Sequence, residues 1–151
     1  VGGKFLACLT LVLFSLLPTV LYYITVYQLG APPGNLDSGG ILGSYIGLFA
    51  LAGAFVAVGV FASSLTNNQI VAFVLATFLC FMSYMAFDSL SRLPVFFGKT
   101  DDIVQSIGIA YHYDSISRGV IDTRDVIYFL SVIILFLAAT VLSLGKRRWE
   151  K

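Results

Sequence analysis

The stretch ILGSYIGLFALAGAFVAVGVFA, from Ile41 to Ala62, contains no charged residue. About 20 consecutive apolar residues in a helix are enough to cross the hydrocarbon core of a bilayer. A segment inside lipid must satisfy its own backbone hydrogen bonds, which an α-helix does. This stretch therefore predicts a membrane-spanning helix.

Three further uncharged stretches of comparable length, residues 5–28, 69–87 and 126–144, predict three more spans. Charged residues make up 11% of the 151-residue chain, well below the roughly 25% of a soluble domain. Short segments of alternating polarity, which would indicate a membrane β-barrel, are absent. We expect an all-α polytopic membrane protein with four transmembrane helices, forming one transmembrane domain over residues 1–151.

Three connections join the predicted spans. Residues 30–40 are rich in Gly and Pro, and residues 63–68 form a short polar turn. The connection over residues 88–125 is long enough to hold structure of its own. Thr100 followed by Asp101 and Asp102 is typical of a helix start, so we expect a short helix there, lying in the membrane interface.

The distribution of Lys and Arg predicts the orientation. Lys4 precedes the first span, and the tail KRRWEK (residues 146–151) is basic. With four spans both ends lie on one side, which the positive-inside rule makes cytoplasmic. The long connection, with six acidic and four basic residues, then faces outward.

Several function classes are disfavoured by what the predicted spans lack. They contain no Asp, Glu, Lys, Arg or His, which proton-coupled transporters, voltage sensors and intramembrane metalloproteases use at membrane depth. No metal-ligand motif or phosphate-binding loop is present, so we expect no cofactor, and no basic patch indicates nucleic acid. The chain starts at Val1 with a nearly immediate apolar run, which we interpret as a fragment lacking its N-terminal part.

Glycines recur at four-residue spacing near the start of the second span, at Gly39, Gly43 and Gly47. Small residues at this spacing let another helix approach closely. The pattern indicates either packing within one subunit or a seam between two subunits. These three glycines are the candidate helix-packing residues.

The most polar stretch, HYDSISRGVIDTRD, runs from His112 to Asp125 and holds the only histidine. One hypothesis is a hydrolase triad made of His112, Asp114 and Ser115 or Ser117. A triad needs a strained nucleophile turn and an oxyanion hole, and no GxSxG motif is present. We therefore expect no catalytic residues, and favour a capped, salt-bridged turn over a contact with substrate or partner.

The same stretch supplies candidate caps and ion pairs. Asp122, with an acid three residues later, is typical of a helix start before the last span. The two arginines can pair with the nearby acids and fix the shape of the turn. The candidate cap and salt-bridge residues are Asp114, Arg118, Asp122, Arg124 and Asp125.

Two long blocks, residues 43–73 and 112–140, resemble ABC-2 type transporter permeases. More narrowly, together with residues 17–39, they are similar to gliding-motility-associated permease subunits of Bacteroidetes. The resemblance implies six transmembrane helices per subunit, of which this chain would hold the last four. It also implies short helices in the outer connection before the last span.

The resemblance implies a function as well. Such a subunit would pair with a second permease subunit in the bacterial inner membrane and dock an ATP-binding cassette subunit on its cytoplasmic side. It would export substrate by alternating access, with ATP hydrolysis in the partner. The alternatives are a membrane scaffold of a motility or secretion complex, and a membrane hydrolase that uses the outer loop.

Overall fold

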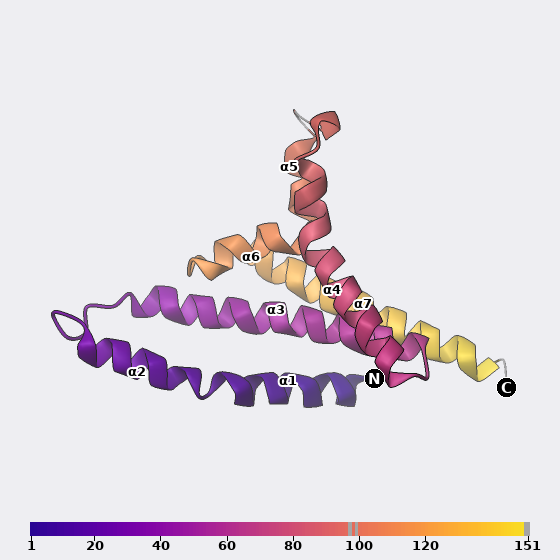
Figure 1. Ribbon diagram of the computed structural model, residues 1–151, viewed down its shortest axis with the longest axis horizontal. Coiled ribbons are helices and arrows are strands. Elements are labelled where there is room, and N and C mark those ends of the chain that lie inside the picture. The colour runs from indigo at the N-terminus through magenta and orange to yellow at the C-terminus, as the bar shows by residue number, and fades with distance from the viewer. Residues whose placement is uncertain (97, 99, 150–151) are drawn as a thin grey trace.

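The structure, a computed structural model, describes residues 1–96, 98 and 100–149, and over these the chain forms helices joined by turns and loops, without strands (Figure 1). Seven α-helices and one short 3₁₀ helix follow one another along these described residues. They are α1 (Gly2–Leu16), α2 (Thr19–Leu29), α3 (Ser38–Leu65), α4 (Gln69–Ser91), η1 (Pro94–Phe96), α5 (Asp101–Ile107), α6 (Ile109–Ser117) and α7 (Thr123–Trp149).

Four of these helical stretches are long and apolar enough to cross a membrane, which confirms the predicted four-helix class. They are Gly2–Leu29, formed by α1 and α2 together, and Ser38–Leu65, Gln69–Ser91 and Thr123–Lys146. The helices extend beyond the uncharged stretches at most of their ends. As a result Asp88 and Asp125, which lie outside the predicted spans, are within α4 and α7.

The first span is interrupted between α1 and α2. Pro18 has no backbone N–H and its ring clashes with the preceding turn, so an uninterrupted helix cannot pass through it. Thr19 begins α2, and its hydroxyl donates a hydrogen bond to the carbonyl of Leu16 across the break.

Side-chain caps determine where α3 and α4 begin. Asp37 Oδ1 accepts a hydrogen bond from the Gly40 N–H at 3.0 Å, so α3 starts at Ser38, three residues before the predicted span. Asn68 Oδ1 accepts from the Ile70 N–H at 2.9 Å and caps α4. In both cases a short polar side chain satisfies an amide that has no partner within the helix.

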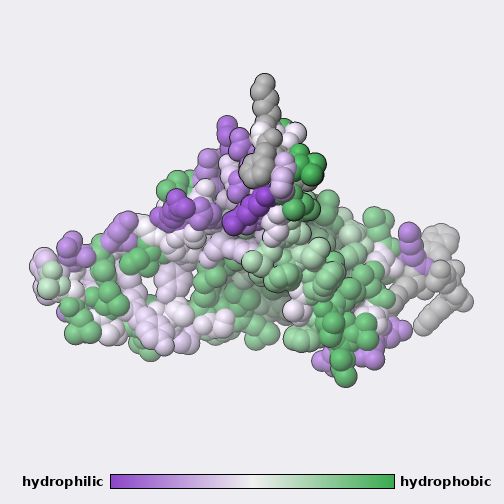
Figure 2. All heavy atoms as spheres, turned by 45° about the horizontal axis from the view of Figure 1, so that its top comes forward, coloured by the Kyte–Doolittle hydropathy of each residue, from purple (hydrophilic) through white to green (hydrophobic). Residues whose placement is uncertain are grey.

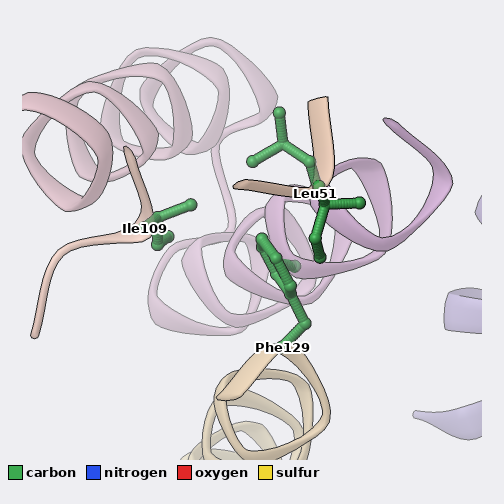
Figure 3. Close-up of a cluster of buried hydrophobic side chains, with 5 residues drawn as sticks. Leu51, Ile109 and Phe129 are labelled. Carbon is green, nitrogen blue, oxygen red and sulfur yellow. The ribbon is translucent and has the colours of Figure 1, made fainter. Parts of the chain in front are cut away.

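Helix α3 is the centre of the molecule and packs against α1, α4, α6 and α7. The core cluster joins three helices and contains Leu51, Ala54, Ile109, Ile116 and Phe129. Figure 3 shows Phe129 of α7 beside Leu51 of α3, with Ile109 of α6 close by. Small residues on α3 permit these close approaches.

Helix α4 packs on α3 but leaves much of its apolar surface exposed. No residue of its most apolar window is buried, and Ile70 and Phe73 are 74% and 72% exposed. Figure 2 shows hydrophilic residues gathered at the protruding end formed by α5 and the end of α4, with hydrophobic residues below it. The exposed apolar faces suit lipid or another apolar helix, as the four-span class requires.

Both described chain ends and the α3–α4 turn lie toward the same end of the molecule (Figure 1). The α2–α3 loop lies at the opposite end, and α4 runs away from the turn to reach α5. This arrangement agrees with the predicted topology in its relative placement of the loops.

Candidate functional site

The connection between α4 and α7, residues 92–122, carries the polar chemistry of the chain. It contains α5 and α6, and α5 begins at Asp101, where the sequence predicted a helix start. Helix α5 packs against α4 and α6, and α6 packs along α3 (Figure 1). Helix α6 of this connection therefore covers the N-terminal half of α3, and α5 lies against α4 and α6.

Gly43 and Gly47 of α3 lie directly under α6 in the same chain. A Cβ on Gly43 would stand 2.8 Å from Gly119 Cα, and a Cβ on Gly47 would overlap Ile116. Gly39 is not part of this contact, because a Cβ there would meet only Asp37 Oδ1, at 3.5 Å. Two of the three predicted packing glycines thus pack against α6 and the residues that follow it.

A hydrogen bond reinforces this contact. The Ser44 hydroxyl lies 2.8 Å from the carbonyl of Ser117 and 2.9 Å from the carbonyl of Gly40, so it can donate to either helix end. Gly119, which ends α6, has a φ of +84°, a conformation that favours glycine. A Cβ on Gly119 would overlap the backbone of Gly40.

His112 of α6 is held on both ring nitrogens. Its Nδ1 lies 2.7 Å from Asp125 Oδ1 of α7, and its Nε2 lies 2.8 Å from the backbone carbonyl of Ser106 of α5. The imidazole ring stacks on Tyr128, with ring centroids 3.9 Å apart and planes 20° from parallel. The Tyr128 hydroxyl donates to the carbonyl of Ile107 at 2.6 Å.

These contacts join α5, α6 and α7 at one point. The side chains of His112 and Asp125 are 13% and 8% exposed, so the pair is largely shielded from solvent. A buried charge is costly unless it is paired and hydrogen-bonded, and here both conditions are met. Asp125 was one of three possible partners for Arg118 and Arg124 in the sequence, and in the structure it pairs with His112.

The predicted triad residues do not meet. Asp114 Oδ2 accepts from Arg118 at 2.7 Å, and the Ser117 hydroxyl donates to the carbonyl of Asp114. Since His112 Nε2 faces a backbone carbonyl, it is not positioned to take a proton from Ser115 or Ser117. This geometry offers no support for the hydrolase hypothesis.

The remaining predicted caps and pairs are placed as follows. Asp114 and Arg118 form an exposed ion pair one turn apart on α6. Asp122 Oδ1 accepts a hydrogen bond from the Arg124 backbone N–H at 3.1 Å, at the start of α7. Asp122 therefore caps α7, while Asp125 turns to His112.

A polar cavity of about 510 Å³ opens between α4, α5 and α6. Within it Asp88 forms an ion pair with Arg92 at 3.0 Å and accepts from Gln105 Nε2 at 3.3 Å. Phenol, amide, hydroxyl and carboxylate groups together offer donors and acceptors to a polar ligand. The lining residues are Tyr84, Asp88, Arg92, Gln105, Ala110, Tyr111, Tyr113, Asp114, Ser115 and Ser117.

Sequence reasoning missed the cavity and the His112–Asp125 pair. Asp88 and Gln105 are 17 positions apart, and no local spacing connects them. One signal was available for the pair, because a lone histidine in an apolar chain needs polar partners. In the part of the chain that the structure describes, no group of three His, Cys, Asp or Glu residues could hold a metal ion.

The described fold and site define an all-helical protein with four helices that could span a membrane. Comparison with known proteins adds no family to this class, since no protein-family model, no curated protein and no solved structure matches the chain.

Proposed function

We propose that the chain is a transmembrane permease subunit of an ATP-driven ABC-2 type exporter, associated with gliding motility. The observation that supports this function best is the α4–α7 connection. It holds two short helices immediately before the last span, of which α6 packs on the N-terminal half of α3 and α5 packs on α4 and α6. Short helices at this place are what the sequence resemblance implies.

The proposed location is the bacterial inner membrane, with the C-terminus in the cytoplasm. Both described chain ends and the α3–α4 turn lie toward one end (Figure 1), and Lys146, Arg147 and Arg148 are at that end of the sequence. Basic residues next to spans favour the cytoplasmic side. The α4–α7 connection and its polar cavity then face outward.

The proposed mechanism is alternating access driven by a separate ATP-binding cassette subunit. Two permease subunits rock between two states, and ATP binding favours one of them. The free energy for this change comes from the different affinities of the two permease states for the nucleotide-bound partner. The exposed apolar faces of α1, α2 and α4 supply surface for the second permease subunit and for lipid.

The test is recovery of the partner. The tagged protein is purified from native membranes in mild detergent and examined for a nucleotide-binding subunit. We expect such a subunit to co-purify, and ATP turnover in reconstituted membranes to depend on the permease. Repeated purification without any nucleotide-binding subunit contradicts the proposal.

A scaffold without transport is the second candidate function. It is favoured by the absence of Asp, Glu, Lys, Arg and His from the middle of the four described spans. A hydrolysis-deficient ATP-binding partner separates the two functions. A transporter loses function with that partner to the same degree as on deletion of the permease, whereas a scaffold keeps it.

A further inference from the structure

The two hydrogen bonds of His112 both end on acceptor atoms. A backbone carbonyl, here that of Ser106, has no proton to give, and an ionised Asp125 carboxylate has none either. A neutral imidazole carries one N–H and so donates to only one of the two. Making both hydrogen bonds therefore requires one proton more than a neutral ring and a carboxylate hold.

We propose that His112 and Asp125 form a proton-binding site that, when loaded, fastens α6 to the start of α7 and the end of α5. The extra proton can be on the imidazole or on the Asp125 carboxyl group. An imidazolium donates from Nδ1 to Asp125 and from Nε2 to Ser106, or a protonated Asp125 donates to Nδ1 while Nε2–H donates to Ser106. Both arrangements hold the same number of protons and make both bonds.

Two aromatic rings contact the imidazole. Tyr128 stacks face to face on His112 with centroids 3.9 Å apart, and a cation over a tyrosine face is attracted by the ring electrons. The Tyr111 ring meets the imidazole edge-on, at 5.4 Å. Asp125 is the charged side chain that the described part of the chain brings to the imidazole.

The other acids of this region are committed elsewhere or lie apart: on α4, Asp88 pairs with Arg92 and accepts from Gln105. Asp122 caps α7 by accepting from the Arg124 N–H, and Asp114 pairs with Arg118 on the exposed side of α6. From α5, the group that reaches the ring is a backbone carbonyl; its two acids lie in its first turn. The hydrogen bonds therefore place the extra proton on the His112–Asp125 pair.

Loss of the proton has a defined structural consequence. One of the two hydrogen bonds breaks as the pH rises, which loosens α6 from either α5 or α7. Because α6 covers Gly43 and Gly47, the proton controls how firmly the cover is held on α3. This inference concerns the chain alone and does not depend on the permease proposal.

The experiment uses the whole chain in lipid nanodiscs, labelled with ¹⁵N at histidine. His112 is the only histidine, so both ring-nitrogen signals report on this site. Amide hydrogen exchange over residues 101–117 is followed across the same pH series and corrected for the intrinsic exchange rate. We expect exchange in α5 or α6 to rise roughly tenfold as the ring signals report loss of the proton, as befits one charge-assisted hydrogen bond.

Asp125→Asn is the decisive variant. Its side-chain N–H donates to a neutral Nδ1, leaving Nε2–H for Ser106, so both bonds form without the extra proton. The exchange over residues 101–117 then becomes independent of pH. Asp114→Asn, which removes a carboxylate from the same helix but not from the site, keeps the response of the unchanged chain.

The outcomes are distinct. A ring that loses its proton without any change in exchange overturns the proposal, and so does an Asp125→Asn variant that keeps the pH response. If Asp125→Asn does not fold, His112→Gln replaces it, since an amide cannot titrate. A pH response that survives in His112→Gln then overturns the proposal, and its loss supports it.

Discussion

Gly43 of α3 and Gly119 at the end of α6 are in backbone contact, and a Cβ on Gly43 would stand 2.8 Å from both the Cα and the carbonyl oxygen of Gly119. Real Cβ atoms do not approach other atoms this closely. The contact joins two parts of the chain that are 76 positions apart, and it attaches the α4–α7 connection to the central helix.

Gly43→Ala should therefore destabilise the chain, because the new methyl group meets backbone that has no rotamer to change. We expect a loss of about 1–3 kcal/mol, as for other overpacked sites. Gly59→Ala on the same helix is the matched control, since a Cβ there meets nothing within 4 Å. Thermal unfolding in a defined detergent measures both variants, and equal effects would contradict the close contact.

Gly119→Ala should destabilise the connection more than its backbone conformation alone explains. The residue has a φ of +84°, and its Cβ would also overlap the backbone of Gly40. Gly98→Ala is a control with a positive φ of +127° and open space around the Cβ. Limited proteolysis between α4 and α7 should cut the first variant faster. The same cleavage rate in both variants would show that backbone strain at a positive φ, and not the contact with Gly40, causes the effect.

Phe129→Ala should open a cavity in the core and cost about 3–5 kcal/mol. The ring is 2% exposed and packs with Leu51 and Ile109 (Figure 3). Phe73→Ala removes the same group from α4, where the side chain is 72% exposed, and should cost much less. The free energy of unfolding, obtained by denaturant titration in mixed micelles, tests this difference. Similar losses would show that the core lies elsewhere.

Asn68→Ala should weaken the start of α4 by about 1 kcal/mol, because the amides of Ile70 and Val71 lose their acceptor. Asn68→Asp keeps the acceptor and adds a charge that suits a helix N-terminus, so it should restore stability. Hydrogen exchange at the first turn of α4 measures both. Unchanged protection of these amides in Asn68→Ala would contradict the capping role of Asn68.

The proposed orientation predicts the labelling of single cysteines. Cys8 and Cys80 are first replaced by alanine, and a cysteine is then placed at Asp102 in α5 or at Asn67 in the α3–α4 turn. A membrane-impermeant maleimide added outside intact cells should label the first position and not the second. The reverse pattern would invert the topology, and labelling at both positions after lysis is the control for accessibility.

The sequence predicted the four spans well because each is a local property, a run of apolar residues of sufficient length. Their ends were less predictable. The side chain of Asp37 caps α3, which begins three residues before the predicted span, and Asp88 and Asp125 lie in α4 and α7 beyond the predicted spans. Helices end where caps and packing end, and charge content does not mark that point.

The site was harder to predict than the spans. Asp114 and Arg118 are one helical turn apart, so their pairing follows from spacing alone. Asp125 has two arginines close to it in sequence, yet it bonds to His112, 13 positions earlier. That choice depends on how α6 packs against α7, which depends in turn on the contact of α6 with the glycines of α3.

The break at Pro18 divides the first span into two helices, and these differ in how firmly they pack on the rest of the chain. Helix α1 packs on α3, while α2 buries none of its residues and is tied to α3 by the Tyr45–Thr19 and Tyr23–Ser38 hydroxyl contacts. Swinging α2 about the proline breaks two neutral hydrogen bonds and leaves the core closed. Displacing α2 therefore costs little, whereas moving α7 would disrupt the core that Phe129 completes.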